Sequence, residues 1–368
     1  MSKKILIVEP FFSGSHASWA NQFKELSSHD IDILSMKGQF WKWRMYGGAI
    51  TLAEEFLAGN YTPDIILATD MLDLTTFLSL IRHKLSSHVK IAVYFHENQL
   101  TYPWKNDSVD KKLNRDINYG FMNYTTALAA DYVLFNSSYN MNSFYDELSN
   151  LLKKMPDYRL NDTVEKLRNK SSVLPIGMHL SKLDTIVEDV YHEDTPLILW
   201  NHRWEFDKNP DDFFKALFIL KERGLKFKVA ILGENYKNSP QIFEKAFSVL
   251  KEEIAASGFM SVNEYRSWVK ASDIIPVTSN HDFFGISVME GVYSGCYPIL
   301  AKRLTYPDLY EHHNNPELFY EDFDELVEKL TFAIENIEDI RKKDFKYLTV
   351  DYDWKNLIYT YDELFDKL

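Results

Sequence analysis

The chain has 368 residues, of which 45% are hydrophobic and 15% aromatic, and its formal net charge is −13 at pH 7. This length and apolar content suffice for two domains with separate cores. Proteins whose main task is to grip nucleic acid are usually basic, so the acidic balance predicts that any RNA contact is confined to one face. The single cysteine, Cys296, excludes an intrachain disulfide and a cysteine-based metal cluster.

The N-terminal segment has the pattern of a first buried strand. Its apolar run, Ile5–Val8, is too short for a signal peptide, and the sequence contains no run of eighteen apolar residues that would suggest a membrane span. We therefore expect a soluble, cytoplasmic protein that does not bind membranes.

The first half of the chain alternates short apolar strands with helices. After the first strand, Gly14 permits a tight turn and Ser15 is placed to cap a helix through Leu26, which makes this turn a candidate anion site. Further strands are predicted at residues 31–34, 65–68, 89–95, 132–135 and 173–177, and helices at residues 72–85, 114–130 and 140–152.

Aromatic and basic residues are interleaved within residues 37–45. Trp41, Lys42, Trp43 and Arg44 are consecutive there. Exposed rings beside cations suit stacking on bases combined with phosphate contact. The alternative is that both tryptophans pack onto the sheet while the cations are solvated.

Four polar residues, His96, Glu97, Asn98 and Gln99, directly follow the predicted strand at 89–95. Open α/β sheets bind ligands at the carboxyl ends of their strands. A lone histidine at such a position is more often structural, but a run of four polar side chains favours a functional role. A metal is not expected, because no second histidine or cysteine stands at ligand spacing in the sequence.

The pattern restarts in the second half of the chain. The acidic stretch 184–195 is the expected linker, which gives an N-terminal domain at 1–183, a C-terminal domain at 196–350, and a helix at 351–368 that packs back on the N-terminal domain. Alternating strands and helices predict parallel, doubly wound sheets. Strands are predicted at residues 197–200, 227–232, 254–256, 273–277 and 297–300, and helices at residues 210–223, 240–251, 263–271, 322–337 and 353–368.

The stretch 281–291 has the features of a nucleotide-sugar site. A loop closed by Gly285 precedes a helix that begins near Ile286, and free backbone N–H groups at a helix start bind phosphate. Asp282 and Glu290 flank this point, and carboxylates accept hydrogen bonds from sugar hydroxyls. The alternative is an ordinary strand–loop–helix turn with solvated acids.

Two cations follow the predicted strand at 197–200. Arg203 and Lys208 stand five residues apart on a loop before a helix. Fixed cations in this position neutralise a diphosphate leaving group as charge builds on it. A charged loop is more often simply solvated, but the helix start beyond this one strengthens the functional interpretation.

The acid at 282, the following Phe284-Gly285 pair and the second acid at 290 resemble the acid-x7-acid signature of family 4 retaining glycosyltransferases. Asp282 stands where most members carry Glu. The resemblance implies a GT-B fold, in which two Rossmann-like domains face a central cleft, and retaining transfer without a metal or other cofactor.

The same resemblance implies roles for individual residues. Arg203 and Lys208 would grip the donor phosphates, Glu290 would hold the ribose hydroxyls, Asp282 would lie near the transferred sugar and His96 near its C6 edge. The implied catalytic residues are His96, Arg203, Lys208 and Asp282. The implied donor-binding residues are Gly14, Ser15, Asn136, Arg203, Lys208, Gly233, Met260, Phe284, Gly285, Ile286 and Glu290.

A finer resemblance covers almost the whole chain. Segments 40–44, 94–103, 135–137, 155–159, 202–210 and 294–298 are similar to the tRNA-queuosine α-mannosyltransferase group. That group transfers mannose from GDP-mannose to the cyclopentenediol of queuosine in the tRNA anticodon, so the implied partners are a nucleotide-sugar donor and tRNA. The implied acceptor-binding residues are Trp41, Lys42, Trp43, Arg44, Glu97, Asn98, Gln99 and Arg159.

Two other functions stay open. A retaining GT-B glycosyltransferase that uses another nucleotide-sugar, or that acts on a small molecule or a glycan, agrees with the acidic charge. A catalytically silent binding module would not need Arg203, Lys208, Asp282 and Glu290 together.

Overall fold

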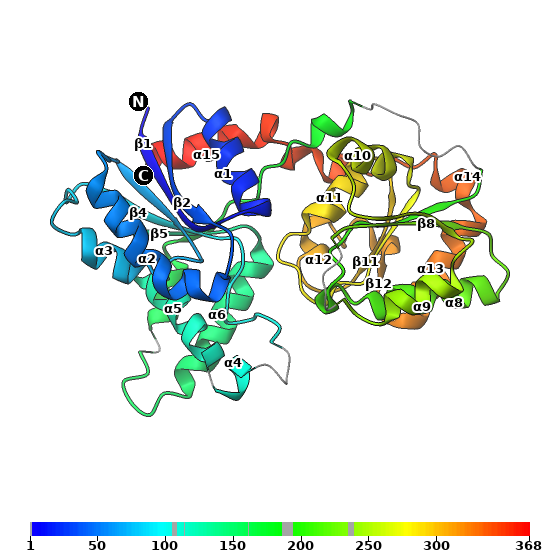
Figure 1. The fold of residues 1–368 in the computed structure, drawn as a ribbon, viewed down its shortest axis with the longest axis horizontal. Helices are drawn as coiled ribbons and strands as arrows, with labels where there is room; N and C mark the ends of the chain where they lie inside the picture. The colour runs from blue at the N-terminus through cyan, green and yellow to red at the C-terminus, as the bar shows by residue number, and fades with distance from the viewer. Residues whose placement is uncertain (1, 105–108, 114, 161, 186–193, 235–238) are drawn as a thin grey trace. The chain divides into compact units, whose positions relative to one another are not determined.

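The computed structural model describes residues 2–104, 109–113, 115–160, 162–185, 194–234 and 239–368. They form two compact units, drawn in Figure 1. The first contains the residues up to Gly177 together with Trp354–Leu368, and the second contains Met178–Asp353. Each unit is built on one six-stranded parallel sheet, with helices alternating with the strands along the chain. The predicted α/β fold class with two doubly wound sheets is confirmed.

The strands of the first unit are β1 (Lys4–Phe12), β2 (Asp30–Lys37), β3 (Ile65–Thr69), β4 (Lys90–Phe95), β5 (Tyr132–Phe135) and β6 (Ser171–Val173). Their order is β2-β1-β3-β4-β5-β6, and all neighbours are parallel. The order reverses direction between β1 and β3, and such a switch point is where open sheets bind ligands. The strand predicted at 173–177 ends earlier, at Val173, and Pro175 within the predicted range has no N–H to donate to a ladder.

The helices of the first unit are α1 (Gly14–Leu26), α2 (Trp41–Ala58), α3 (Leu74–Ile81), α4 (Val109–Lys112), α5 (Arg115–Ala129), α6 (Ser138–Lys153), α7 (Thr163–Arg168) and α15 (Trp354–Lys367). Figure 1 shows α1 and α15 on one face of the sheet and α2 and α3 on the other. Side-chain caps fix two helix starts: Asp73 accepts from the N–H of Thr76 at 3.0 Å, and Ser137 accepts from the N–H of Asn140 at 3.0 Å.

Two features of the first unit differ from the sequence predictions. The residue that caps α1 is Ser13, not Ser15, because the helix already begins at Gly14. Helix α2 was not predicted at all: Gly47 and Gly48 lie in its interior, where glycine weakens helix propensity. The structure requires a small residue at position 48, because a Cβ there would lie 2.8 Å from the Pro10 side chain on β1.

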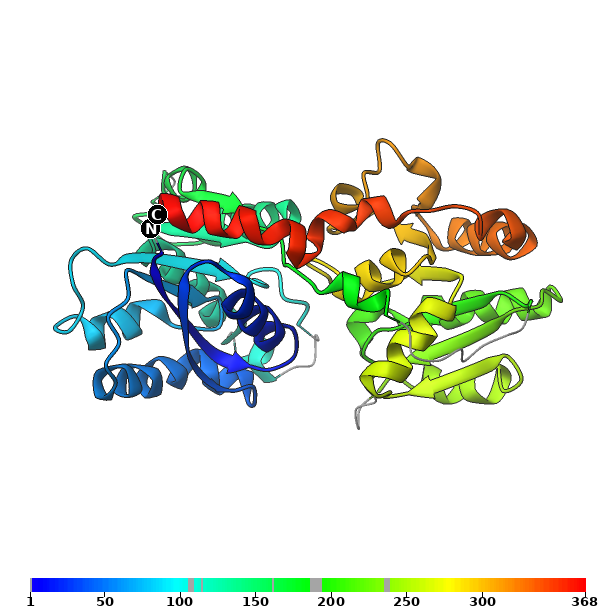
Figure 2. The same ribbon diagram turned by 90° about the horizontal axis from the view of Figure 1, so that it is seen from above.

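The C-terminal helix α15 belongs to the first unit and packs against α1. Trp354 stacks on Phe23 with ring centroids 6.2 Å apart, and the indole N–H of Trp19 donates to the Tyr361 hydroxyl at 3.0 Å. Figure 2 shows α15 running back along the sheet toward the start of β1. Gly177 is required beneath Trp354, because an added Cβ would lie 2.3 Å from the indole.

The units divide at residues 177 and 353, not at the predicted 183 and 350. The short 3₁₀ helix Leu180–Leu183 belongs to the second unit, where the N–H of Ser181 donates to Asp353 at 2.5 Å. Residues 186–193 of the predicted linker lie outside the described part of the chain.

The second sheet has the order β12-β11-β10-β7-β8-β9, again with parallel neighbours. Its strands are β7 (Leu197–Trp200), β8 (Lys228–Leu232), β9 (Ile254–Gly258), β10 (Ile274–Val277), β11 (Tyr297–Ala301) and β12 (Phe319–Tyr320). Its helices are α8 (Pro210–Glu222), α9 (Ile242–Val249), α10 (Val262–Ala271), α11 (Ile286–Tyr293), α12 (Tyr306–Leu309), α13 (Phe323–Glu335) and α14 (Ile337–Ile340). Because β7 and β10 are neighbours, the loops after them meet at one edge of the sheet. Among the described residues, no helix has the length and apolarity needed to cross a bilayer.

The packing of α15 leads to a first prediction. Trp354 is fully buried, and replacing it with alanine should lower the free energy of unfolding by about 3–5 kcal/mol, because a cavity remains beside Phe23. Tyr359 lies on the same helix and is 69% exposed, so Tyr359→Ala is the matched control and should change stability by less than about 0.5 kcal/mol. Urea unfolding measures both variants, and equal losses would show that α15 does not contribute through this contact.

Candidate active site

The start of α11 in the second unit has the backbone geometry that was expected from the sequence. Gly285 adopts the left-handed conformation, with φ 82° and ψ 53°, and is the residue that precedes the first turn of the helix. Residues with a Cβ atom are strained in this conformation, whereas glycine is not. The predicted helix start at Ile286 is confirmed, and the N–H groups of the first turn have no carbonyl partner within the helix.

Lys208 lies at the loop that leads into this helix. Its ammonium group donates to the carbonyl of His281 at 3.0 Å and lies 3.3 Å from Oδ2 of Asp282 and 3.5 Å from Oδ2 of Asp207. The side chain is 12% exposed. Burial alone would raise the pKa of Asp282, but the charge of Lys208 outweighs it and lowers that pKa below its usual value. The hydroxyl of Tyr306 donates to the same Asp282 oxygen at 3.0 Å.

His202 and Arg203 precede this lysine after β7. The ring of His202 lies 3.0 Å from the Ser287 hydroxyl in the first turn of α11. Burial and the nearby charge of Lys208 lower the pKa of His202 to about 4, so its ring is neutral at pH 7. Arg203 is 55% exposed, and its guanidinium lies 3.3 Å from the Glu205 carboxylate.

Glu290 lies deeper along α11 and has a partner that the sequence did not indicate. The hydroxyl of Tyr265, on α10, donates to Oε2 of Glu290 at 2.5 Å. Asn201 links the same tyrosine to α11, because its amide contacts the Tyr265 hydroxyl at 3.1 Å and donates to the carbonyl of Ser287 at 2.7 Å. Burial raises the pKa of Glu290, against the lowering effect of the hydrogen bond from Tyr265.

The other predicted donor-binding residues of the second unit take different places. Gly233 follows β8 with φ 133°, and a Cβ there would lie 2.1 Å from the carbonyl of His202, so only glycine fits. Met260 is half-buried after β9, beside Phe259, which is 80% exposed. Phe284 is buried against Tyr352, so only its backbone is left for a ligand.

His96 in the first unit is held by its backbone. Its N–H donates to Oδ1 of Asp70 at 2.9 Å, and its carbonyl accepts from the amide of Asn136 at 2.7 Å. Asn136 was predicted to bind the donor, whereas its side-chain N–H is used to fix this loop. Asn140 completes the arrangement, because its amide donates to Oδ1 of Asn136 at 2.9 Å and to the carbonyl of Phe95 at 3.1 Å.

The residues after His96 are largely engaged within the same loop. Asn98 is buried, donates to Asn140 at 2.8 Å and accepts from the N–H of Thr101 at 3.0 Å. The side chain of Gln99 donates to Glu97 at 2.9 Å. Asn98 thus shapes the loop, and its role in acceptor binding stays a prediction, as do those of Glu97 and Gln99.

The aromatic and basic segment forms the first turn of α2, and its two tryptophans behave differently. Trp41 packs among Tyr102, Trp104 and Tyr119, so it packs as the alternative predicted, but against the loop after β4 and helix α5 and not onto the sheet. Trp43 is 63% exposed, so the solvent-facing alternative holds for this residue.

The cations of this segment also differ. The ammonium group of Lys42 lies 5.1 Å from the centre of the Trp104 ring, a cation–π contact. The guanidinium of Arg44 donates to the carbonyl of Lys37 at 3.1 Å. Arg159 is exposed and donates to the carbonyl of Met155 at 2.9 Å, next to Tyr158, which is 88% exposed.

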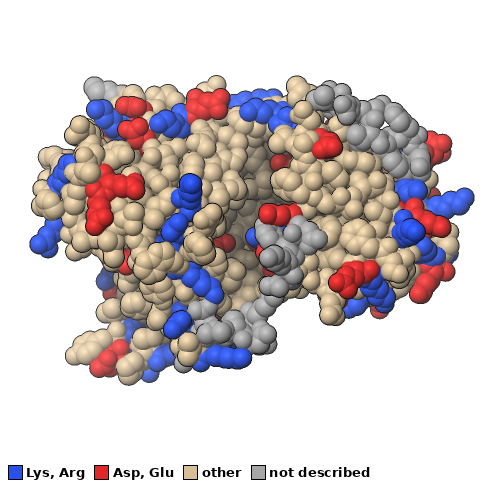
Figure 3. Space-filling view, in the orientation of Figure 1, with Lys and Arg blue, Asp and Glu red and all other residues tan. Residues whose placement is uncertain are grey.

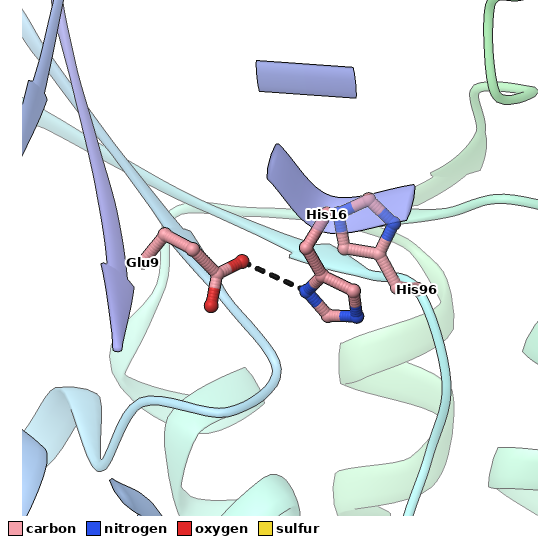
Figure 4. A group of neighbouring side chains, drawn as sticks. All are labelled: Glu9, His16 and His96. Atoms are coloured by element: carbon pink, nitrogen blue, oxygen red, sulfur yellow. Dashed lines mark hydrogen bonds and ion pairs between the residues drawn. The ribbon is translucent and has the colours of Figure 1, made fainter. Parts of the chain in front are cut away.

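The structure also brings together three residues that are distant in the sequence: Glu9 at the end of β1, His16 on α1 and His96 after β4 (Figure 4). Their polar atoms lie within 4.8 Å of one another, close enough for a metal to be considered. The argument that no second histidine stands near His96 is therefore wrong, because α1 supplies one from 80 positions earlier. Gly14 and Ser15 begin the same helix. The expectation that the protein needs no metal stays a prediction.

Both halves of the chain resemble known proteins. Residues 4–178 match the family model described as tRNA-queuosine alpha-mannosyltransferase N-terminal, and residues 185–347 match that of glycosyl transferases group 1. The tRNA-queuosine alpha-mannosyltransferase of Drosophila melanogaster is 37% identical over 320 residues, which are 84% of this chain and 82% of that protein.

Solved structures support the fold at much lower identity. The sucrose-phosphate synthase of Thermosynechococcus elongatus superposes with a TM-score of 0.72 at 12% identity, and 99% of this chain and 98% of that chain are covered. The Anabaena protein HepE, solved in complex with UDP, gives a TM-score of 0.68 at 13% identity, with 99% and 100% covered. These matches show the GT-B fold. The Drosophila relative, at 37% identity over most of both chains, shows that this chain belongs to the tRNA-queuosine alpha-mannosyltransferase family of glycosyltransferases.

Proposed function

We propose that this protein transfers mannose from GDP-mannose to the cyclopentenediol of queuosine in a tRNA anticodon, with retention at the anomeric carbon. The observation that carries the proposal is the contact of Lys208 with Asp282 beside the glycine-capped start of α11. Family membership and the name of the Drosophila relative support the choice of sugar and acceptor. Because tRNA is the acceptor, we also infer that the protein works in the cytoplasm.

The leaving group is the part of the reaction that these residues serve. The bond between the anomeric carbon and the phosphate oxygen breaks, the acceptor oxygen bonds to that carbon on the same face, and the departing phosphate takes the acceptor proton. Negative charge that builds on the diphosphate is stabilised by Lys208, by Arg203 and by the N–H groups at the start of α11. With these positive groups in place, we infer that no metal is needed.

The donor hydroxyls would meet carboxylates that are already oriented. Tyr265 fixes one oxygen of Glu290, and Lys208 with Tyr306 fixes one oxygen of Asp282. In each case the second oxygen remains as an acceptor, which suits recognition of ribose by Glu290 and of the transferred sugar by Asp282.

Contact with tRNA is assigned to the start of α2. Trp43 and Phe40 expose 63% and 77% of their surfaces, and the guanidinium of Arg44 donates to the carbonyl of Lys37 at the end of β2. A Cβ on Gly47 would lie 2.8 Å from the Trp43 ring, so this glycine lets one face of the indole lie on the helix. Figure 3 shows both blue and red side chains on the face in view.

A second candidate is transfer to a small molecule or a glycan. The net charge of −13 favours it, because the chain repels polyanions at long range. In that case tRNA would neither bind nor inhibit.

The proposed activity is tested by incubating the protein with radiolabelled GDP-mannose and total tRNA. Label should enter tRNA from cells that make queuosine and should be absent from tRNA of cells that lack it. Label in both pools, or in neither while GDP-mannose is still hydrolysed, would refute the proposed acceptor. Parallel incubations with other nucleotide-sugars test the choice of donor.

Loss of a phosphate-neutralising cation should reduce turnover. Arg203→Met should lower kcat by roughly 10²–10³, the scale of one charge-stabilising group, and should leave stability almost unchanged because the side chain is half exposed. Lys215→Met is the control, since Lys215 is equally exposed and pairs only weakly with Asp211 on α8. Unchanged kcat in the Arg203 variant would remove this residue from the mechanism.

The assignment of α2 is tested by separating tRNA binding from nucleotide binding. Trp43→Ala should weaken tRNA binding roughly 5- to 100-fold, the value of one stacked base, and should not alter the Kd for GDP. Leu80→Ala, which truncates an exposed apolar residue on α3, is the control and should change neither. Equal loss of tRNA and GDP binding in the Trp43 variant would indicate a structural role instead.

A further inference from the structure

Glu9 and His16 form a hydrogen-bonded acid–histidine pair at the edge of the first sheet where its parallel strands end. Among the described residues at this edge, it is the only such pair that is buried. Nδ1 of His16 lies 2.8 Å from Oε2 of Glu9, and the other carboxylate oxygen accepts from the N–H of Phe11 at 2.7 Å. The Glu9 side chain is completely buried and that of His16 is 13% exposed. Both oxygens of Glu9 are thus occupied, and the orientation of the His16 ring is fixed.

The second ring nitrogen of His16 faces away from Glu9. Figure 4 shows Nδ1 directed at the carboxylate and the opposite edge of the ring directed away from it. Within the described part of the chain, the hydrogen bond to Glu9 is the one that the His16 ring makes. Nε2 is therefore available to a ligand that enters beside the ring.

Ionisable groups from three strand ends lie near His16. Glu9 lies near the end of β1, Asp70 lies just after β3, and Glu97 and His96 lie just after β4. Burial works to lower the pKa of His16, but Glu9, with smaller contributions from Asp70 and Glu97, outweighs it and raises the pKa to about 9. The ring is therefore an imidazolium at pH 7, and its Nε2 is a hydrogen-bond donor.

His96 is in the opposite state. Burial, together with the charge of His16, lowers the pKa of His96 well below its usual value, so its ring is neutral. Both nitrogens of this ring are buried without a partner among the described residues, and so is Oδ2 of Asp70. Buried polar atoms are normally satisfied, so these three atoms indicate that a polar ligand completes the site.

The geometry of Glu9, His16 and His96 favours a proton on His16 over a metal ion shared by the three residues. The rings of His16 and His96 lie face to face, with centroids 4.1 Å apart and planes at 36°. Lone pairs lie in the planes of their rings, so stacked rings do not direct them at one ion. Glu9 is already bonded through both oxygens, and a metal would have to displace those bonds.

The charges around His16 indicate which chemical class of ligand this site would bind. One imidazolium faces the carboxylates of Glu9 and Glu97, and burial raises the pKa of the nearby Asp70 well above its usual value, so the surroundings are not positive. A phosphate would be repelled there, whereas a neutral polyol offers hydroxyls that both donate and accept. The atoms on hand match it: an N–H donor on His16, a neutral ring on His96 and a free carboxyl oxygen on Asp70.

We propose that the Glu9–His16 pair is a polyol-binding element, in which Nε2 of His16 donates a hydrogen bond to a hydroxyl of a sugar or cyclitol held at the carboxyl ends of β1, β3 and β4. This inference rests on the proposed function, which supplies two such molecules: the transferred hexose and the diol of the acceptor.

His16→Asn tests the element, because the asparagine amide can take the place of Nδ1 and keep the bond to Glu9 while Nε2 is removed. The KM for the molecule that His16 binds should rise roughly 10- to 100-fold, the value of a hydrogen bond from a charged donor. If only the KM for GDP-mannose rises, and rises also in donor hydrolysis without tRNA, the hydroxyl that His16 binds belongs to the hexose. If only the KM for tRNA rises, the hydroxyl belongs to the acceptor diol. The Kd for GDP, which has no hexose, should be unchanged.

The protonation state is measured without any substrate. Side-chain ¹⁵N NMR of the free protein should show His16 as an imidazolium at pH 7.5 that titrates near pH 9, and His96 as neutral. Glu9→Gln should move the His16 titration to lower pH. In the wild type, kcat/KM should fall as pH rises through about 9, because the Nε2 proton is lost, and His16→Asn should lack this limb.

The outcomes distinguish a failure of the proposed function from a failure of the polyol-binding element. A failure to label tRNA, with donor hydrolysis still impaired in His16→Asn, would refute the proposed acceptor and leave the polyol element intact. A neutral His16 at pH 7.5, or KM values for both substrates within twofold of wild type in His16→Asn, would overturn the element. So would a stoichiometric metal in the purified protein that His16→Asn removes, since the cluster would then be a metal site.

Discussion

The buried ammonium group of Lys208 is the contact on which the site of the second unit depends. Burial would raise the pKa of Asp282, but the charge of Lys208 outweighs it and keeps this carboxylate ionised in a region that is almost closed to water. The bond of this lysine to the carbonyl of His281 also fixes the loop before α11, so the helix start and the lysine are held as one rigid group. The same charge helps to keep His202 neutral, and the neutral ring can bond to Ser287 in the first turn of the helix.

One edge of the sheet carries polar and charged side chains in both units, but the side chains differ in chemical type. In each, loops after neighbouring parallel strands place charged groups at one edge of the sheet. The second unit places a cation and free N–H groups there, which suits a phosphate. The first unit places the Glu9–His16 pair and a neutral His96 there, held by buried amides from Asn136 and Asn140. In our proposal this arrangement binds a hydroxyl and is unfavourable for an anion.

The sequence predicted the strands and most helices because their signals are local. Continuous apolar runs such as Ile5–Val8 and Leu197–Trp200 are typical of strands buried on both faces, and Gly285 marked the start of α11 correctly. Helix α2 was missed because its glycines serve contacts with Pro10 and Trp43 that appear only once the chain is folded.

Contacts between residues that are distant in the sequence could not be predicted either. Tyr265 approaches Glu290 from 25 positions away, and His16 approaches His96 from 80. Nothing in local spacing links either pair. The packing of α1 against the sheet, and of α10 beside α11, creates them. The spacing rule that argued against a second histidine fails for the same reason, since it counts positions along one segment only.

The aspartate at position 282 follows from the same constraint. Position 282 carries an aspartate, whose side chain is one methylene shorter than that of a glutamate. Here the shorter carboxylate receives two bonds on one oxygen, from Lys208 and from Tyr306, and is almost buried. The 3.3 Å contact with Lys208 and the 3.0 Å bond from Tyr306 are both made by this shorter side chain. The position of the Asp282 carboxylate is therefore tied to the position of the lysine.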